Sequence, residues 1–251
     1  HTFEDSLPKR LEYTMYVLSL KEWNLDTFMY RWWWNPLKKL GRRMDVFNIN
    51  RSIAVLFPFF VAGVFLVFNK YYLSPELLHA LPTVAAGISL LLVLRAFTER
   101  RHVRRALAMV IMAHFWVALA ISFNEHFDQS HIMIYLSGVV FSGVVAVFAI
   151  NRLRRTERNV DLGRFHGHVF EHPRIALLFL LAALGLAGFP ITPTFLGEDL
   201  IYSHIHPDQL VLAFLVAMSF VLNGLALVRI YARVFLGPHV KTYHEVAYRS
   251  A

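Results

Sequence analysis

Long apolar runs separated by short polar loops dominate the chain from residue 52 onward. Six of these runs have roughly the length needed to span a bilayer, about 17–25 residues, and they cover residues 52–69, 79–97, 106–123, 131–150, 174–202 and 209–235. The fifth run is too long for one regular span, and it contains both prolines and carboxylates. The pattern predicts an all-α polytopic membrane protein with about six transmembrane helices.

The first 51 residues follow a different pattern, with short apolar stretches mixed with aromatic and basic residues. Three consecutive tryptophans, Trp32 to Trp34, precede Lys38 and Lys39, a mixture typical of segments in the headgroup region of a membrane. We interpret this segment as an interfacial arm, with a partner-docking arm and a polybasic lipid site as alternatives. The predicted organisation is an arm over 1–51, a membrane domain over 52–236 and a cytoplasmic tail over 237–251.

Composition supports the membrane assignment and removes several other classes. Hydrophobic residues make up 57% of the 251 residues and charged residues only 17%, which is unusual for a soluble domain. The net charge of +8 does not indicate nucleic acid, because the basic residues fall between apolar runs rather than on one soluble face. The absence of cysteine excludes disulfides and thiolate metal sites.

Basic residues fill every second loop. They cluster before the first run, between the second and third runs, and between the fourth and fifth, whereas the alternate loops together hold only Lys70. Basic loops remain on the cytoplasmic side of a membrane. The sequence therefore predicts an integral protein of the inner or cytoplasmic membrane with both ends in the cytoplasm.

The fifth run contains the stretch AGFPITPTFLGED, residues 187–199. Pro190 and Pro193 each remove a backbone donor and clash with the preceding turn, so a helix must break near Gly188 to Thr194. Thr192 or Thr194 is placed to cap the helix that resumes. An ionisable group at membrane depth is costly and indicates function, so Glu198, one turn into that helix, is the first candidate.

From about residue 49 the chain resembles the antiporter-like membrane subunits of respiratory complex I. This family also includes Mrp-type cation antiporters, membrane-bound hydrogenase subunits and the transporter half of inorganic-carbon uptake systems. The resemblance is carried by VAGVFLVFNKYYLSPELLH (61–79), RRALAMVIMAH (104–114), AGFPITPTFLGEDLI (187–201) and VLNGLALVRIYARVFLG (221–237). The matching segments look like helices eight to thirteen of the family.

The resemblance implies a fold built from two inverted five-helix repeats, each with one broken helix and a line of polar groups near the membrane midplane. Residues 79–236 look like the second repeat, and the first run looks like the last helix of the first repeat. The chain is then a partial module, or a piece of a longer carrier, and its implied partners are the lipid bilayer and other membrane subunits of a larger complex.

The resemblance also implies an ion path in which Glu198 occupies the position of a Lys or Glu in the broken helix. His114, inside an apolar helix, could titrate near neutral pH, although a structural, hydrogen-bonded histidine is the alternative. Arg104 and Arg105 match the basic pair of the family. An arginine can fix a charge there but cannot release its proton.

Other family positions have lost their ionisable groups. Val55 stands where the eighth helix carries a histidine, and the lysine position of the eleventh helix falls at or near Gly143. Tyr135 stands where that helix carries its first histidine. Water in a cavity lined by Ser137, Ser142 and His114 is expected to complete any path.

The stretch HGHVFEH, residues 166–172, was weighed as a metal site. His168 and His172 would share a helix face, with His166 and Glu171 nearby. The spacing is not HExxH, so we favour a solvated loop or an interface contact and expect no metal and no cofactor.

These observations indicate a membrane subunit, or a fragment of one, in a proton- or cation-translocating assembly similar to the membrane arm of NADH-quinone oxidoreductase. The chain itself is not expected to be a catalyst, because no cofactor motif or catalytic set is present. The alternative is a degenerate, non-conducting module that serves as scaffold or membrane anchor for partner subunits.

Overall fold

The computed structural model describes residues 8–20, 25–36, 39, 49–124, 127–157 and 160–238, and every regular element within them is helical. The chain divides into two units, residues 1–44 and 45–251. The predicted all-α membrane fold is therefore confirmed. Lys38 and residues 239–251 of the expected tail lie outside the described residues.

The first unit consists of short helices. They are α1 (Lys9–Leu20), α2 (Leu25–Met29) and the π-helical turn η3 (Tyr30–Trp34). α1 exposes large apolar side chains such as Tyr13, Tyr16 and Leu20, and Trp32 of η3 is also exposed. Their apolar surface fits the headgroup region in which the sequence places this arm.

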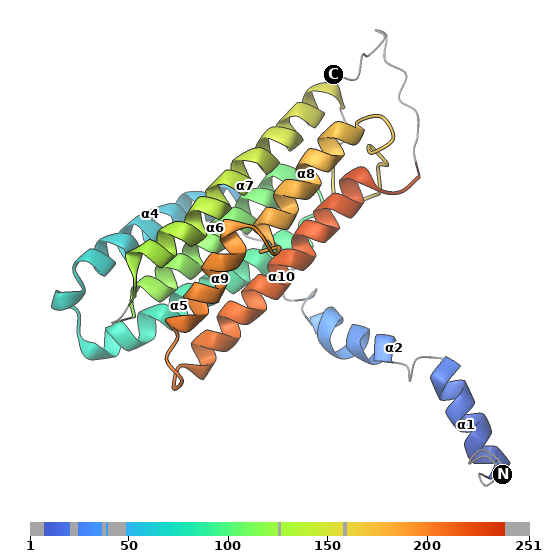
Figure 1. Ribbon diagram of the computed structural model, residues 1–251, viewed down its shortest axis with the longest axis horizontal. Helices are drawn as coiled ribbons and strands as arrows, with labels where there is room; N and C mark the ends of the chain where they lie inside the picture. The colour runs from blue at the N-terminus through green and yellow to red at the C-terminus, as the bar shows by residue number, and fades with distance from the viewer. Residues whose placement is uncertain are drawn as a thin grey trace. The chain divides into compact units, whose positions relative to one another are not determined.

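The second unit is a bundle of long helices (Figure 1). They are α4 (Ile49–Phe68), the 3₁₀ turn η5 (Lys70–Tyr72), α5 (Pro75–Thr98), α6 (Val103–Ser122), α7 (Gln129–Thr156), α8 (Pro173–Leu186), α9 (Pro193–Ser203) and α10 (Leu210–Phe235). In the described chain, α5, α6, α7 and α10 are long and apolar enough to cross a membrane, while Ala54–Phe68 and α8 are shorter apolar helices.

The core of the bundle is formed around α6, which packs against α4, α5, α7 and α10. Leu107 and Val110 of α6, Val139 of α7 and Ile230 of α10 are fully buried. The opposite face of α7 exposes large apolar side chains such as Phe141, Val144 and Phe148. Such an exposed apolar face is stable only in contact with lipid or with another membrane subunit.

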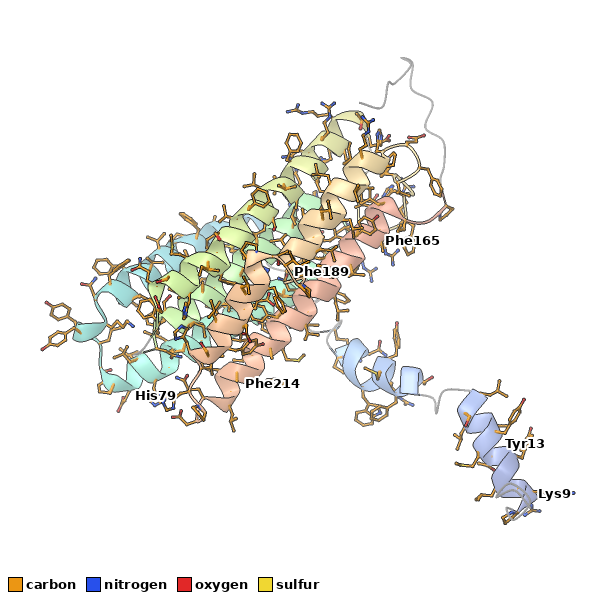
Figure 2. The ribbon with its side chains drawn as sticks, viewed as in Figure 1. Lys9, Tyr13, His79, Phe165, Phe189 and Phe214 are labelled. Atoms are coloured by element: carbon orange, nitrogen blue, oxygen red, sulfur yellow. The ribbon has the colours of Figure 1, made fainter. Side chains whose placement is uncertain are left out.

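The loops fall into two groups at opposite ends of the bundle, as their charge pattern predicts. Figure 2 shows Phe165 at one end and His79 at the other, with Phe189 between them. At the first end the Leu162 N–H donates to the Arg100 carbonyl at 2.8 Å, which joins two arginine-rich loops. At the other end Asn124 donates to the His204 carbonyl at 2.8 Å.

The loop before α8 also closes the end of α10. Backbone N–H groups of residues 166–169 donate to the carbonyls of Arg233, Val234, Phe235 and Leu236 at 3.0–3.4 Å. The last carbonyls of a helix have no partner within the helix, so this loop supplies the donors they lack. The loop is consequently held in place by main-chain bonds.

Candidate ion-path site

The predicted break in the fifth run is present between α8, which ends at Leu186, and α9, which begins at Pro193. Gly188 has φ +67° and Ile191 has φ +85°. The left-handed region is costly for a β-branched residue, by roughly 1–2 kcal/mol, so the fold holds Ile191 in a strained turn. Strained backbone of this kind concentrates at functional sites.

Thr192 caps the helix that resumes after the break. Its Oγ1 accepts the Phe195 N–H at 3.3 Å and donates to the Phe189 carbonyl at 2.7 Å. Thr194, the other candidate cap, is instead fully buried, and its backbone and hydroxyl lie directly against Gly138 of α7. The structure therefore assigns the capping role to Thr192.

Glu198 folds back across the break. A Cβ built on Gly188 would lie 2.6 Å from the Glu198 carboxyl carbon, so only glycine leaves room for the carboxylate there. Glu198 is half-buried, whereas its neighbour Asp199 is exposed. No Lys, Arg or His among the described residues lies within ion-pair distance of Glu198.

His114 lies at the centre of the bundle and is 1% exposed. Its Nδ1 lies 2.6 Å from the Tyr135 hydroxyl of α7, and its Nε2 bonds the Asn223 amide of α10. With that amide as donor, the neutral ring carries its proton on Nδ1 and donates it to the Tyr135 oxygen. The Tyr135 hydroxyl proton then remains available for another acceptor.

Glu198 lies near Tyr135, although no hydrogen bond joins the two among the described residues. The Glu198 carboxylate lies within electrostatic reach of both the Tyr135 and Tyr202 hydroxyls. The ring of Phe220 packs beside all three aromatic groups, with centroids 6.2 Å from His114, 6.1 Å from Tyr135 and 5.8 Å from Tyr202. His114 and Tyr135 are thus hydrogen-bonded to each other, and Glu198 lies near the Tyr135 hydroxyl in the same apolar setting.

Small residues bring α7 against the broken helix. A Cβ on Gly197 of α9 would lie 2.8 Å from the Tyr135 backbone nitrogen, so the two backbones almost touch. A Cβ on Gly143, where the family has its lysine, would lie 3.0 Å from Ile111 Cδ1. Gly197 of α9 and Gly143 of α7 therefore serve close contact between helices.

Several residues singled out from the sequence lie away from this site. Arg104 and Arg105 are in the first turn of α6, and Arg105 bonds the His102 ring at 3.3 Å. Ser137 is exposed and bonds the carbonyl of Ile134 in its own helix. It does not share a cavity with buried His114 and Ser142, which corrects that expectation.

Two further arginines, Arg229 and Arg233, lie on α10. Arg229 lies over the Phe97 ring at 5.6 Å and Arg233 over the Phe165 ring at 4.3 Å, both at the basic end of the bundle. They point away from the broken helix rather than pairing with Glu198. Asn223 is an interhelical hydrogen-bonder, as its place in α10 indicated.

The bridging role of Tyr135 was missed from the sequence. The signal for it is the spacing of Tyr135, Gly138 and Ser142, which recur at i, i+3 and i+7 and share the buried face of α7. A phenol on a face that otherwise holds small residues marks the point at which another helix approaches. Neither Phe220 nor Tyr202 carried a comparable signal.

Comparison with known proteins places this geometry in a family. The model of the transmembrane family described as NADH:quinone oxidoreductase/Mrp antiporter matches residues 53–223. Because this match covers more than half of the chain, the chain belongs to that family. Its broken helix and its buried His114 and Tyr135 pair both lie within the matched residues.

Three relatives whose names describe them as subunits of NADH-quinone or NADH-ubiquinone oxidoreductases support the assignment to this family. The chain is 26% identical over 146 residues to NADH-quinone oxidoreductase subunit M of Rickettsia prowazekii, covering 57% of this chain and 29% of the relative. It is 28% identical over 169 residues to NADH-ubiquinone oxidoreductase chain 4 of Dictyostelium discoideum, covering 65% and 31%. It is 30% identical over 103 residues to NADH-quinone oxidoreductase subunit N 1 of Solibacter usitatus, covering 40% and 21%.

The matches leave most of each relative uncovered. The chain spans about a fifth to a third of the length of these three proteins. No solved structure matches the chain at a comparable level of significance.

Proposed function

We propose that this chain forms one half of a proton path in a larger antiporter-like membrane assembly, and that Glu198, Tyr135 and His114 carry the proton. The observation that supports this most is the hydrogen bond of 2.6 Å between His114 and Tyr135, together with the electrostatic proximity of Glu198 to the Tyr135 hydroxyl. Proton relays require groups within hydrogen-bond reach of one another. Tyr135, at the position of the first histidine of the eleventh family helix, supplies a hydroxyl to this path, while Val55 and Gly143 supply no ionisable group.

A transfer along this path is balanced. A proton arriving at Nε2 of His114 makes an imidazolium, the Nδ1 proton moves to the Tyr135 oxygen, and the Tyr135 hydroxyl proton moves to the Glu198 carboxylate. The products are a neutral imidazole, an intact tyrosine and a neutral Glu198. No charge remains on Tyr135, whose ionisation would be unfavourable.

Asn223 suits both states of the histidine. Its amide nitrogen faces Nε2, while its Oδ1 is buried and has no hydrogen-bond partner. A half-turn of the amide presents that oxygen to an Nε2–H and the nitrogen to the vacant side. Asn223 therefore positions the ring before transfer and accepts from it afterwards.

Release takes place at the end of the bundle to which α9 leads. Tyr202 and His204 follow Glu198 along α9, and His204 Nε2 lies 2.9 Å from His131 Nδ1. A cavity of about 440 Å³ opens there, lined by His79, His204, His206 and Asp208 among others. Imidazoles at the mouth of a cavity can accept protons near neutral pH.

The arginine-rich end of the bundle faces the cytoplasm in this proposal, in the inner or cytoplasmic membrane, because basic loops are retained there. The membrane domain comprises residues 52–236, between an interfacial arm over 1–51 and a tail over 237–251. In this proposal the chain is one part of a larger membrane assembly, because it covers 21–31% of the length of the three relatives named above. Arg104 and Arg105 fix positive charge at the cytoplasmic entrance.

A structural scaffold is the second candidate function. It is favoured by the close packing of Gly143 against Ile111 and by the exposed, apolar Val55, neither of which can carry an ion. In this case Glu198 only stabilises the turn at Gly188, and proton movement does not depend on its charge.

Glu198→Gln distinguishes the two functions, with Asp199→Asn as a matched control on the adjacent, exposed carboxylate. Native assemblies are reconstituted in liposomes, and proton uptake under a valinomycin-induced K⁺ diffusion potential is read with a trapped pH dye. We expect at least a tenfold loss for Glu198→Gln with normal assembly and near-normal uptake for Asp199→Asn. Equal uptake in both variants and in the unmodified protein would leave the scaffold function.

A further inference from the structure

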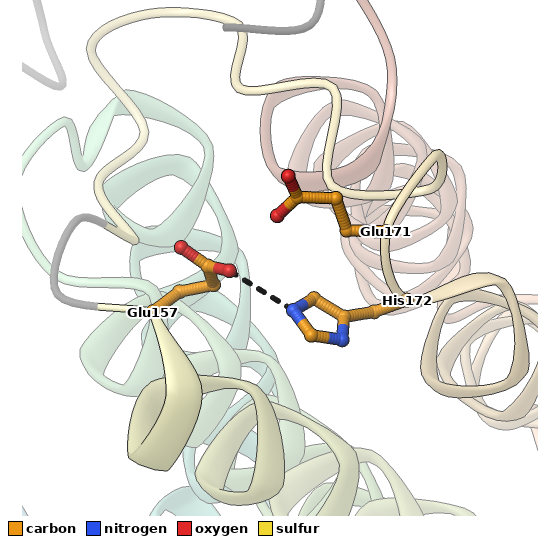
Figure 3. A group of neighbouring side chains, drawn as sticks. All are labelled: Glu157, Glu171 and His172. Carbon is orange, nitrogen blue, oxygen red and sulfur yellow. Dashed lines mark hydrogen bonds and ion pairs between the residues drawn. The ribbon is translucent and has the colours of Figure 1, made fainter. Parts of the chain in front are cut away.

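We propose that Glu157, Glu171 and His172 bind a divalent transition-metal ion at the arginine-rich end of the bundle (Figure 3). One potential ligand atom from each residue lies within 4.8 Å of the other two. In Figure 3 both carboxylates and the imidazole converge on one space between the end of α7 and the start of α8. This site is separate from the path through Glu198.

The backbone fixes all three ligands. Glu157 is the C-cap of α7, and its N–H donates to the Leu153 carbonyl at 2.8 Å. Glu171 and His172 close the turn before α8, where the His172 N–H donates to the His168 carbonyl at 2.8 Å. The same loop is bonded to the end of α10, so the ligands are held on two immobilised segments.

The donor set defines the class of ion. One imidazole nitrogen and two carboxylate oxygens, without sulfur, suit borderline divalent ions such as Zn²⁺ and Mn²⁺. The His172 Nε2 and Glu157 Oε1 atoms are 2.9 Å apart. Ligands about 2.0–2.1 Å from a tetrahedral zinc lie about 3.3 Å apart, so a small outward shift accommodates the ion.

Charge and burial at this place favour a cation. Glu157 is 3% exposed and His172 8%, and a second carboxylate, Glu171, adds further negative charge beside them. The C-terminal end of α7 also directs its negative dipole toward the site.

The sequence analysis considered His166, His168, Glu171 and His172 as ligands and expected no metal here, and this proposal departs from it in both respects. Residues 168–171 form a turn rather than a helix, so His168 and His172 do not share a helix face. His166 stacks on His168 and contacts Asp161 instead. The missing ligand is Glu157, which lies fourteen positions before Glu171 and is brought in by the fold.

The test is metal binding by the chain in its native assembly after treatment with EDTA. Zn²⁺ is titrated by calorimetry, and Mn²⁺ binding is followed by the loss of its free EPR signal. We expect one site for each copy of the chain. Glu171→Gln, at the least buried ligand, should weaken binding at least tenfold, while His166→Gln in the same loop should leave it unchanged.

Two results would overturn the proposal. The first is equal affinity of Zn²⁺ and Mn²⁺ for the Glu171→Gln variant and for the unmodified protein, which would place the ion elsewhere. The second is that neither ion binds, which would leave Glu157 and His172 as an ion pair only. Because Glu171 is half-buried and ends no helix, its variant is expected to fold, and thermal unfolding without metal verifies this.

Discussion

The side chains of Glu99 and Glu198 are both at least partly buried, but the hydrogen-bond donors and cations around the two carboxylates differ. The Glu99 carboxylate accepts the backbone N–H groups of Arg100, Arg101 and His102 at 3.1, 2.8 and 3.3 Å. It also pairs with Arg95 at 3.1 Å. Glu198 has no such cation among the described residues and lies against the strained turn at Gly188.

The pKa of Glu99 reflects the N–H donors and the arginine that stabilise its negative charge. Burial raises the pKa of this carboxyl, but the hydrogen bond from the Arg101 N–H and the charge of Arg95 together outweigh burial and hold the pKa below 4.5. Glu99 thus stays ionised and closes the tight turn between α5 and α6. The comparison teaches that a carboxylate such as Glu99, whose negative charge is stabilised by N–H donors and an arginine, is part of the fold. A carboxylate without such partners, like Glu198, is the better candidate for exchanging a proton.

The largest expected effect is on stability at Glu99. Glu99→Ala leaves three N–H groups and the Arg95 side chain without this acceptor, which costs about 3 kcal/mol. Thermal unfolding of the detergent-solubilised assembly, followed by circular dichroism, measures the loss. If Glu198→Ala proved equally destabilising, both carboxylates would be structural and the comparison would fail.

A smaller destabilisation is expected where α9 touches α7. Gly197→Ala drives a methyl group into the Tyr135 backbone, which costs about 1–3 kcal/mol by overpacking. Gly87→Ala is the matched control, because no atom lies within 4 Å of its Cβ position. Chemical unfolding of the two variants should separate them, and equal stabilities would show that the close contact is not present.

The smallest effect is a pH dependence carried by Glu99. Its folded pKa lies below the unfolded value of 4.5, so its contribution to stability is complete above pH 4.5 and is lost as pH falls through the lower folded value. The difference in melting temperature between the unmodified protein and Glu99→Gln should therefore shrink below pH 4.5. A constant difference between pH 3 and pH 7 would contradict the assigned pKa direction.

Local sequence rules were sufficient for the helices and for the break. Apolar run length placed the spans, and the two prolines located the interruption within a few residues. The polar contacts of His114 were not accessible in the same way, because they join His114, Tyr135 and Asn223 from three helices. No local pattern encodes which faces of α6, α7 and α10 meet, since that is decided by the packing of residues distant in sequence.

The carboxylates illustrate the same limit. Glu99 and Glu157 look like ordinary loop residues in the sequence, and both are buried only because distant segments fold over them. Glu198 was recognised because it lies inside an apolar run, where an ionisable group is costly. Sequence reasoning therefore found the carboxylate that violates a local rule and missed those that obey it.

Proton uptake by a Tyr135→Phe assembly tests the central claim most directly. This change removes only the hydroxyl that the proposed path places between His114 and Glu198, and Tyr202→Phe, one turn beyond Glu198, serves as the control. We predict a loss of at least tenfold in voltage-driven proton uptake for Tyr135→Phe with normal assembly, and a smaller loss for Tyr202→Phe. Unchanged uptake in correctly assembled Tyr135→Phe liposomes would contradict the account.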